Sequence, residues 1–362
     1  MLINMRKNII GVDLFAGAGG LSLGAKMAGI DVVLAIEKDN NSANTYLKNH
    51  KDTNVIIDDI SNIKHIDVEH KNNITVLFGG PPCQGFSSSN QKTRNKKNPQ
   101  NWLYSEFIRL ANSWNPDWIV FENVEGIVST EKGYFLKKLL YNFNDIGYNC
   151  IWNIFNASDY GVPQLRQRFF LIASKKRLNI NLNKTGKKLK KVTVFDAIGD
   201  LPDVDNGNKI NYLEYDKKHV SKYSKKMRTK KGCTGHLVTK NSDIVIERYK
   251  YIPEGGNWQN IPNELMTNYK DKSKCHTNIY HRLSSGLPSI TLGNFRKSMF
   301  IHPWQNRGLS IREAARLQSF PDYYDFIGTI SSQQQQVGNA VPPYLSKYIF
   351  DIIIKMERLY KL

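Results

Sequence analysis

Cysteine is scarce in this chain. Its 362 residues include four cysteines, at the unevenly spaced positions 83, 150, 233 and 275. Such a set predicts no disulfide framework and is typical of a protein in a reducing compartment. Cys233, His236, Cys275 and His276 fit no strong zinc-binding template either, so we expect no metal site.

Long hydrophobic runs are also absent. Hydrophobic residues make up 40% of the chain, yet no apolar run is long enough to cross a bilayer. The first residues lead into a strand-like segment without the pattern of a signal peptide. We therefore expect a cytoplasmic protein that does not act at a membrane. A chain of this length has room for one large or two moderate domains.

Acidic residues are too few to balance the basic ones. The chain has 51 Lys and Arg against 32 Asp and Glu, a formal net charge of +19. Segments 175–191 and 217–231 each carry eight basic residues and no acid. Basic runs are often only a solvated surface. The alternative is a polyanionic partner, most simply nucleic acid.

Strand-like and helix-like segments alternate in the first half of the chain. The strands are expected at 8–15, 32–36, 55–58, 74–78, 118–121 and 168–173, and the helices at 21–28, 41–49, 104–114 and 135–143. This alternation predicts an α/β fold, a doubly wound, mostly parallel sheet with helices on both faces. From about 176 the sequence becomes polar, basic and irregular. Helices are expected again at 311–318 and 343–359.

A cysteine-bearing turn follows the strand expected at 74–78. Residues 79–87 have the sequence GGPPCQGFS. The two prolines stiffen the turn and place Cys83 just past the carboxyl end of a buried strand, where a thiol is presented to a substrate. A cysteine kept only for packing is more often inside the strand. We therefore expect Cys83 to be a nucleophile.

A glycine-rich turn lies between the first strand and the first helix. Gly17 and its neighbours are small, which lets a ligand approach the backbone and the helix N-terminus. Glu37, twenty residues later, ends the second strand, where an acid binds ribose hydroxyls. The pair predicts an adenosine-type cofactor, and a nicotinamide cofactor, a flavin or a methyl donor all fit. Asp59, after the third strand, is placed to accept the adenine amino group or is an ordinary loop acid.

A further acid, Glu122, ends the strand expected at 118–121. A buried acid of this kind can be a structural hydrogen-bond acceptor, the role we expect for Asn123. In open α/β sheets, however, ligands collect at the carboxyl ends of the strands. Gly17, Glu37 and Cys83 fall at three other such ends. The four positions together predict an active site at one edge of the sheet.

Several motifs, in this order, resemble those of the DNA (cytosine-5) methyltransferases. They are FAG at 15–17, PPCQ at 81–84, ENV at 122–124, QLRQR at 164–168 and QVGNAVPP at 336–343. Residues 311–321, IREAARLQSFP, look like the family's penultimate motif. The match spans nearly the whole chain except the irregular stretch after 175. The chain looks most like a single-chain bacterial or phage enzyme of the restriction-modification type, which implies the class I fold of S-adenosylmethionine-dependent methyltransferases.

The resemblance implies a covalent mechanism. Cys83 adds to C6 of a cytosine that is flipped out of the duplex, and Glu122 protonates or hydrogen-bonds N3. Arg166 or Arg168, chiefly Arg168, binds the cytosine O2 or a neighbouring phosphate. C5 then takes the methyl group of S-adenosylmethionine, and S-adenosylhomocysteine is the product.

The remaining site residues are assigned by the same resemblance. The cofactor site is expected to comprise Phe15, Gly17, Gly19, Glu37, Asp59, Ile60, Pro82, Leu103 and Asn339. The DNA contacts are expected from Gln84, Ser87, Arg94, Thr291, Leu292 and Arg296. Further candidates to contact bases or phosphates are Arg282, Asn294 and Lys297.

The resemblance also predicts the domains and partners. A catalytic domain at 1–175 is completed by the segment 325–362, a target-recognition domain covers 176–305, and a connecting motif covers 306–324. The chain is expected to act as a monomer on double-stranded DNA, with a cognate restriction endonuclease acting on the same site.

Three other functions remain as alternatives. The first is a tRNA cytosine-5 methyltransferase of the same fold. The second is an NAD-dependent oxidoreductase, which explains the glycine turn and Glu37 but leaves Cys83 and Glu122 unexplained. The third is a catalytically silent DNA-binding relative. The stretch between 168 and 311 is longer than the tRNA branch usually has, which favours DNA as the substrate.

Overall fold

The computed structural model describes residues 8–82, 103–178, 180–182, 188–215, 220–267, 278–293, 295 and 298–360. The chain divides into two compact units. Unit 1 comprises Met1–Asn156, Gln167–Lys188 and Pro343–Leu362, and unit 2 comprises Ala157–Arg166 and Leu189–Pro342. Unit 1 is therefore discontinuous, with its last segment starting at Pro343. The predicted boundaries differ from this division, since residues 157–166 and 325–342 belong to unit 2.

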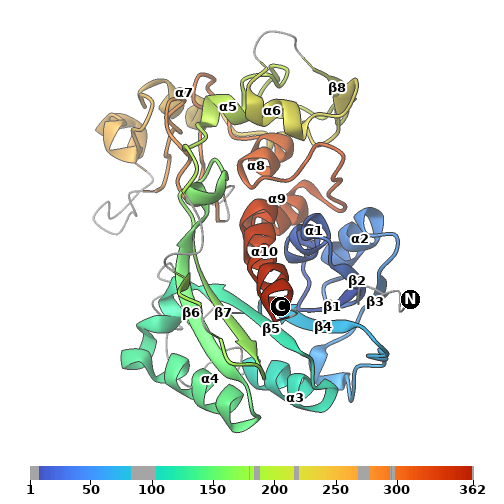
Figure 1. Cartoon of the computed structure of the whole chain (residues 1–362). Helices are drawn as coiled ribbons and strands as arrows, with labels where there is room; N and C mark the ends of the chain where they lie inside the picture. Colours follow the sequence, from blue (N-terminus) through green and yellow to red (C-terminus); the bar gives the residue numbers. More distant parts are fainter. Residues whose placement is uncertain are drawn as a thin grey trace. The chain divides into compact units, whose positions relative to one another are not determined.

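Unit 1 is built on a seven-stranded sheet in the order β3-β2-β1-β4-β5-β7-β6 (Figure 1). The strands are β1 Ile9–Leu14, β2 Asp31–Ile36, β3 Asn54–Ile56, β4 Ile74–Gly79, β5 Trp118–Val124, β6 Asn149–Asn156 and β7 Gln167–Ser174. Strands β1 to β5 pair in parallel. Strand β7 pairs antiparallel with both β5 and β6. The expected mostly parallel α/β sheet is confirmed, and β6 is an addition that the sequence pattern did not predict.

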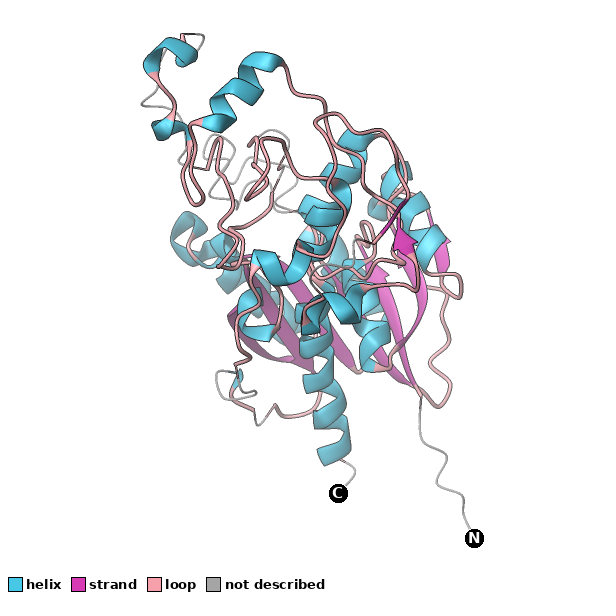
Figure 2. Cartoon of the chain, turned by 90° about the horizontal axis from the view of Figure 1, so that it is seen from above, coloured by secondary structure: helices cyan, strands magenta, loops and turns pink. Residues whose placement is uncertain are grey.

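Helices cover both faces of this sheet (Figures 1 and 2). They are α1 Gly20–Ala28, α2 Asn40–Asn49, α3 Tyr104–Trp114, α4 Tyr134–Asp145 and α10 Pro343–Leu359. Buried side chains of α3 and α4 share one core with alternate residues of β1, β4, β5 and β7. On the opposite face Phe350 of α10 contacts Phe78 of β4, with ring centroids 4.9 Å apart.

Helices α1 and α10 pack very closely. A Cβ atom at Gly24 would lie 2.4 Å from the Cβ of Ser346 and 2.6 Å from the backbone nitrogen of Lys347. The hydroxyl of Ser346 donates a hydrogen bond to the carbonyl of Leu21 over 2.8 Å. The absent side chain at Gly24 is what allows the C-terminal helix to lie directly against α1, the helix that follows the glycine-rich turn.

Unit 2 contains short elements joined by long connections. Its helices are α5 Val194–Ile198, α6 Lys222–Met227, α7 Asp243–Lys250, α8 Ile311–Leu317 and α9 Ile330–Asn339, and its strands are β8 Leu213–Glu214 and β9 Gly232–Cys233. All residues of α8 are buried. Among the described residues, we find no helix with the length and apolar character that a membrane span requires.

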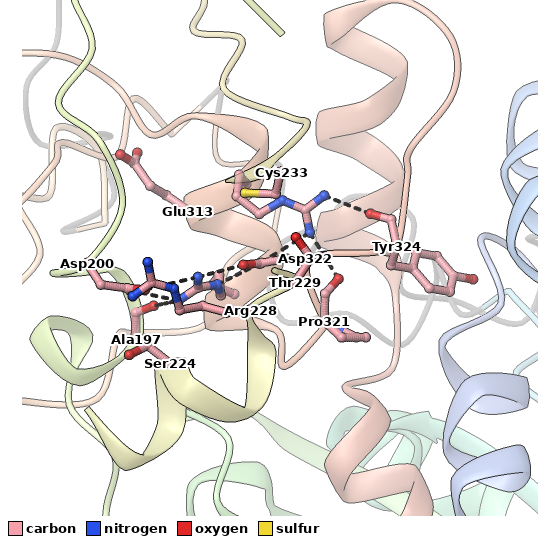
Figure 3. Close-up of polar contacts among 12 residues, drawn as sticks. Ala197, Asp200, Ser224, Arg228, Thr229, Cys233, Glu313, Pro321, Asp322 and Tyr324 are labelled. Atoms are coloured by element: carbon pink, nitrogen blue, oxygen red, sulfur yellow. Dashed lines mark hydrogen bonds and ion pairs between the residues drawn. The ribbon is translucent and has the colours of Figure 1, made fainter. Parts of the chain in front are cut away.

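A buried network of charges surrounds α8 (Figure 3). Arg316 donates to Asp322 over 2.6 Å and to Asp200 over 2.9 Å. Arg312 donates to the carbonyls of Pro321 and Tyr324. Because buried charges are stable only when they are paired, this network fixes the arrangement of α5, α8 and the segment that follows α8.

Candidate active site

The carboxyl ends of four parallel strands of unit 1 lie in one row. Leu14 of β1 is in register with Ile36 of β2 on one side and with Gly79 of β4 on the other, and Gly79 is in register with Phe121 of β5. The residues directly after these four paired positions are Phe15, Glu37, Gly80 and Glu122. The backbone pairing therefore brings the predicted functional positions of these four strands to one edge of the sheet, as the sequence predicted.

The glycine-rich turn after β1 has a left-handed backbone. Phe15 has φ 59°, Gly17 has φ 55° and Gly19 has φ 85°. A Cβ atom built at Gly17 would meet no heavy atom within 4 Å among the described residues, so the turn borders open space there. Positive φ favours glycine, and the open space lets another group approach the backbone.

Glu37 holds this turn. Its Oε2 accepts a hydrogen bond from the backbone nitrogen of Gly17 over 2.7 Å, and its Oε1 accepts one from Asp39 over 2.8 Å. The backbone nitrogen of Ala16 donates to the carbonyl of Ile36 over 3.0 Å. The predicted pair Gly17 and Glu37 is therefore in direct contact, and the half-buried carboxylate lies beside the open space of the turn.

Asp59 and Ile60 follow β3. The Oδ1 of Asp59 accepts hydrogen bonds from the backbone nitrogen and the hydroxyl of Ser61, over 3.0 Å and 2.8 Å, and Lys38 lies 3.3 Å from its Oδ2. These contacts lower the pKa of Asp59, and the hydrogen bond from the backbone of Ser61 has the largest effect. Ile60 is buried in the core. Asp59 thus stabilises its own turn, which fits the alternative that it is a loop acid.

A buried acid below the glycine-rich turn was missed by the sequence analysis. Asp13 in β1 accepts a hydrogen bond from the hydroxyl of Ser22 over 2.6 Å, and that hydroxyl accepts one from Tyr46 over 2.7 Å. Within the described part of the chain, the Oδ1 of Asp13 has no hydrogen-bond partner. Burial raises the pKa of Asp13 to about 8, with a further rise from the charge of Glu37. The signal in the sequence is an acid inside the apolar run IIGVDLF.

Glu122 and Arg168 form an ion pair at the end of β5. The Nε of Arg168 lies 3.1 Å from the Oε1 of Glu122, and both side chains are largely buried. Because Glu122 pairs with Phe170 in the antiparallel ladder, Arg168 is its diagonal neighbour on the same face of the sheet. A Cβ atom at Gly80 would lie 2.5 Å from the Oε2 of Glu122, so only glycine leaves room for the carboxylate there.

Asn123 of β5 holds the turn that follows β4. The side-chain nitrogen of Asn123 donates to the carbonyl of Pro81 over 3.2 Å, and its side-chain oxygen accepts from the backbone nitrogen of Val124 over 2.9 Å, the acceptor role expected of it. Pro82 is half-buried and precedes Cys83 directly. Cys83, Gln84, Ser87 and Arg94 lie outside the described residues, as do Asn294, Arg296 and Lys297. Leu103, at the start of α3, packs partly buried against the core of unit 1.

The other predicted residues belong to unit 2. Asn339 is the exposed last residue of α9 and accepts a hydrogen bond from Gln335 over 2.6 Å. The hydroxyl of Thr291 donates to the carbonyl of Leu165, and Leu292 is fully buried. Arg166 is also buried, and its guanidinium group donates to main-chain carbonyls of unit 2, whereas Arg168 pairs with Glu122 in unit 1. This difference supports Arg168 as the arginine that works with Glu122.

The expectation that Arg282 contacts DNA is wrong. Its side chain is buried, and its guanidinium group donates to the carbonyls of Ile252, His302 and Tyr249. It is a structural arginine. Cys233 and His236 are also buried, with the sulfur 3.4 Å from Nε2. Burial raises the pKa of Cys233 to about 11 and lowers that of His236 to about 4, so both are neutral at pH 7.

Part of the basic sequence has structural partners. Lys176 lies 2.7 Å from the carboxylate of Glu357, which also accepts a hydrogen bond from Trp118. Lys191 pairs with Asp159. Helix α6, by contrast, exposes Lys222, Lys225 and Lys226 at the surface of unit 2. The segment 217–231 is therefore the better candidate for a polyanion-binding surface.

Comparison with known proteins identifies similar chains. The family model described as C-5 cytosine-specific DNA methylase matches residues 9–355. The Type II methyltransferase M.DdeI of Desulfomicrobium norvegicum is 35% identical, over 94% of this chain and 88% of its own. The Type II methyltransferase M1.HphI of Haemophilus parahaemolyticus is 34% identical, over 96% of this chain and 87% of its own.

The fold is similar to that of a solved structure. A DNA modification methyltransferase encoded within a prophage of Escherichia coli superposes with a TM-score of 0.78 at 29% sequence identity. The superposition covers 97% of this chain and all of the other. The likeness thus includes both units and extends beyond the sheet of unit 1.

Proposed function

The chain belongs to the C-5 cytosine-specific DNA methylase family, and from this we propose how its own residues transfer a methyl group to C5 of cytosine in DNA. It is a DNA (cytosine-5)-methyltransferase. The observation that carries the residue assignments is the row of strand ends, which places Glu37, the glycine-rich turn, Glu122 and the turn leading to Cys83 at one edge of the sheet.

We propose that the cofactor is S-adenosylmethionine. The open space at Gly17 is the place where such a group fits, because no heavy atom of the described residues lies within 4 Å of a Cβ atom built there. Glu37 keeps lone pairs for the ribose hydroxyls after its two bonds to backbone nitrogens. Phe15, Gly19, Ile60, Pro82 and Leu103 are the other residues of unit 1 proposed for this site, and Asp59 joins it when its bond to Lys38 opens. The family resemblance also assigns Asn339, in unit 2, to the cofactor. When bound, S-adenosylmethionine supplies the methyl group from its positively charged sulfonium.

Cytosine C5 must be activated before it accepts a methyl group. The Cys83 thiolate forms a bond to C6, and Glu122 delivers a proton to N3, so that C5 becomes enamine-like and nucleophilic. After C5 has gained the methyl group, its proton leaves to water or another base. The bond between sulfur and C6 then breaks, the double bond between C5 and C6 returns, and Glu122 recovers its proton.

Arg168 assists Glu122. The guanidinium group of Arg168, 3.1 Å from the carboxylate, offsets the negative charge that Glu122 gains once its proton has moved to N3. The remaining donors of Arg168 suit the cytosine O2 or a neighbouring phosphate. We assign no catalytic role to Arg166, whose guanidinium group is bonded within unit 2.

The DNA substrate is double-stranded, and the target base leaves the stack to reach Cys83, at a cost of about a few kcal/mol. We propose that unit 2 supplies target recognition, with Thr291 and the lysines of α6 near the DNA. Leu292, which is fully buried, supports the segment of Thr291 from within unit 2. Gln84, Ser87, Arg94 and Arg296 remain proposed DNA contacts. We also propose that the protein acts as a monomer in the cytoplasm. Its proposed partner is a cognate restriction endonuclease that acts on the same DNA site.

The experiment uses purified protein, methyl-labelled S-adenosylmethionine, plasmid DNA and, in parallel, bulk tRNA. Label is expected in 5-methylcytosine of the DNA. Cys83→Ser is expected to abolish transfer while DNA binding stays within about twofold, and Cys150→Ser is the matched control that keeps full activity. Label in tRNA alone would establish the tRNA alternative, and full activity of Cys83→Ser would rule out the covalent mechanism.

A further inference from the structure

Two side chains of the QLRQR motif connect distant segments of unit 2. Gln164 is fully buried and Arg166 is 1% exposed. The Oε1 of Gln164 accepts a hydrogen bond from the backbone nitrogen of Leu292 over 3.0 Å. The Nη1 of Arg166 donates to the carbonyl of the same Leu292 over 2.8 Å. Both backbone polar groups of Leu292 are thus held by this motif.

The same side chains reach the segment around Asn339. The Nη2 of Arg166 donates to the carbonyl of Gly338 over 2.9 Å and to that of Ala340 over 3.1 Å. These are the two residues that flank Asn339. Gln164 donates to the Oε1 of Gln318 over 3.2 Å, and Gln318 donates to the carbonyl of Val337 over 2.8 Å. The guanidinium group of Arg166 therefore bonds both to Leu292 and to the two residues that flank Asn339.

A planar guanidinium group fixes its acceptors relative to one another, because its donors point in set directions. A shift of Leu292 would break a bond of Arg166 or move the group, and a buried donor left without a partner is costly. The carbonyls of Gly338 and Ala340 would follow that movement. A lysine has no such fork and cannot hold both sets of carbonyls in the same way.

We propose that Gln164 and Arg166 are positioning residues that couple the two segments of unit 2 proposed to contact ligands. The segment of Thr291 and Leu292, proposed to contact DNA, is linked through them to the segment of Asn339, proposed to contact the cofactor. Because the two segments share these bonds, a ligand that holds one segment in its binding position also favours the binding position of the other and raises the affinity for the second ligand. This inference rests on the proposed function. By linkage the two effects are equal, and couplings of this kind are typically about 5- to 150-fold.

The test measures DNA binding with and without saturating S-adenosylhomocysteine, so that no turnover occurs. The probe is a labelled duplex that contains the methylated site, identified beforehand with the wild-type enzyme. The wild-type Kd for DNA is expected to fall at least about fivefold when S-adenosylhomocysteine is present. In Arg166→Lys this ratio is expected to approach one.

Two further variants separate coupling from stability. Gln164→Met, which removes the bond to Leu292 at similar volume, is expected to lower the ratio as well and serves as the second variant should Arg166→Lys not fold. Arg248→Lys is the control, because Arg248 is also a buried arginine of unit 2 and donates to the carbonyl of Leu265. Its ratio is expected to match that of the wild type.

The outcomes are distinct. A ratio of one in the wild-type enzyme, or an unchanged ratio in Arg166→Lys and Gln164→Met, overturns the coupling, even if both variants have a lowered melting temperature. Failure of the wild-type enzyme to methylate any DNA would instead overturn the proposed function, and it is seen before the binding experiment begins.

Discussion

At the scale of single residues, the proposed mechanism depends on where the carboxyl group of Glu122 lies. Arg168 holds it from one side, and the missing side chain of Gly80 leaves room for it on the other. A carboxyl group in such a position transfers a proton to a base placed against it without a search for the right geometry. We therefore expect Glu122 and Arg168 to contribute more to the rate of methyl transfer than to the stability of the fold.

Replacing Glu122 by Gln is expected to lower the single-turnover rate of methyl transfer by roughly 10²- to 10⁴-fold, the usual contribution of a general acid. The Kd values for DNA and for S-adenosylhomocysteine are expected to stay near those of the wild type. Gly80→Ala, which displaces the carboxylate, is expected to lower the same rate by a smaller factor. An undiminished rate in Glu122→Gln would contradict the proposed role.

Asp13 makes stability depend on pH. Its pKa rises from 3.8 to about 8 on folding because it is buried, so the folded state holds a proton that the unfolded state has released between these values. The stability due to this neutral acid is complete below about pH 4 and is lost as pH rises to about 8, by at most about 1.4 kcal/mol per pH unit.

Asp13→Asn, which stays neutral and still accepts from Ser22, is expected to remove this loss. The measurement is urea unfolding of both proteins at pH 5, 6, 7 and 8. The free energy of unfolding of the variant minus that of the wild type is expected to grow with pH. A difference that stays constant over this range would show that Asp13 is ionised in the folded protein.

At the scale of elements, helices α1 and α10 of unit 1 pack very closely at Gly24. A Cβ atom at Gly24 would lie 2.6 Å from a backbone nitrogen of α10. A backbone atom, unlike the end of a side chain, cannot relieve such a clash by a change of rotamer. The contact ties the C-terminal helix to the helix that begins at the glycine-rich turn. Adding one methyl group at Gly24 and measuring the free energy of unfolding tests how tightly the two helices pack.

Gly24→Ala is expected to lower the free energy of unfolding by about 1–2 kcal/mol. Overpacking typically costs about 1–3 kcal/mol, and a clash that includes a backbone atom belongs to the upper part of this range. The higher helix propensity of alanine offsets about 1 kcal/mol of it. Thermal and urea unfolding measure the change. Gly286→Ala, where a Cβ would meet nothing within 4 Å among the described residues, is the control expected to be near neutral. An equal effect at both positions would contradict the packing argument.

The strands and helices of the first half could be predicted because their buried faces are apolar and regularly spaced. Strand β6 could not, because it is mostly half-exposed and carries Asn149, Asn153 and Asn156. Helix α9 was missed because glutamines such as Gln333, Gln334 and Gln336 form its buried side, and a hydrophobic pattern does not detect them.

The candidate site was predictable to a similar extent. The apolar runs predicted Glu37 and Glu122 at strand ends, since both residues directly follow such a run. The choice between Arg166 and Arg168 depends on the antiparallel register of β5 and β7, which no local pattern encodes. Asp13 was missed because its partners, Ser22 and Tyr46, come from two different helices.

At the scale of the whole molecule, the formal charge of +19 indicates strong and salt-dependent binding to DNA. The charge is not all available for this purpose, since Lys176 and Lys191 are paired with acids. The exposed lysines of α6 are available, and they lie in the segment 217–231 that carries no acid. This helix is therefore expected to contribute to the electrostatic part of binding.

Changing Lys222, Lys225 and Lys226 together to Gln is expected to weaken DNA binding without changing which sequence is methylated. The slope of log K against log salt should become shallower by roughly 0.9 for each lysine that contacts a phosphate. Fluorescence anisotropy over a salt series measures it. The control changes the exposed Lys48, Lys51 and Lys71 of unit 1 to Gln, and an equal loss of slope there would show that α6 has no special role.

The central claim, that this chain methylates C5 of cytosine in DNA through Cys83, is tested most directly in living cells. The measurement is base-resolution cytosine-conversion sequencing of DNA from a methylation-deficient host that expresses the chain or its Cys83→Ser variant. We expect protected cytosines in one short sequence context with the wild-type chain and none with the variant. Soluble wild-type protein that leaves every cytosine unprotected would contradict the account.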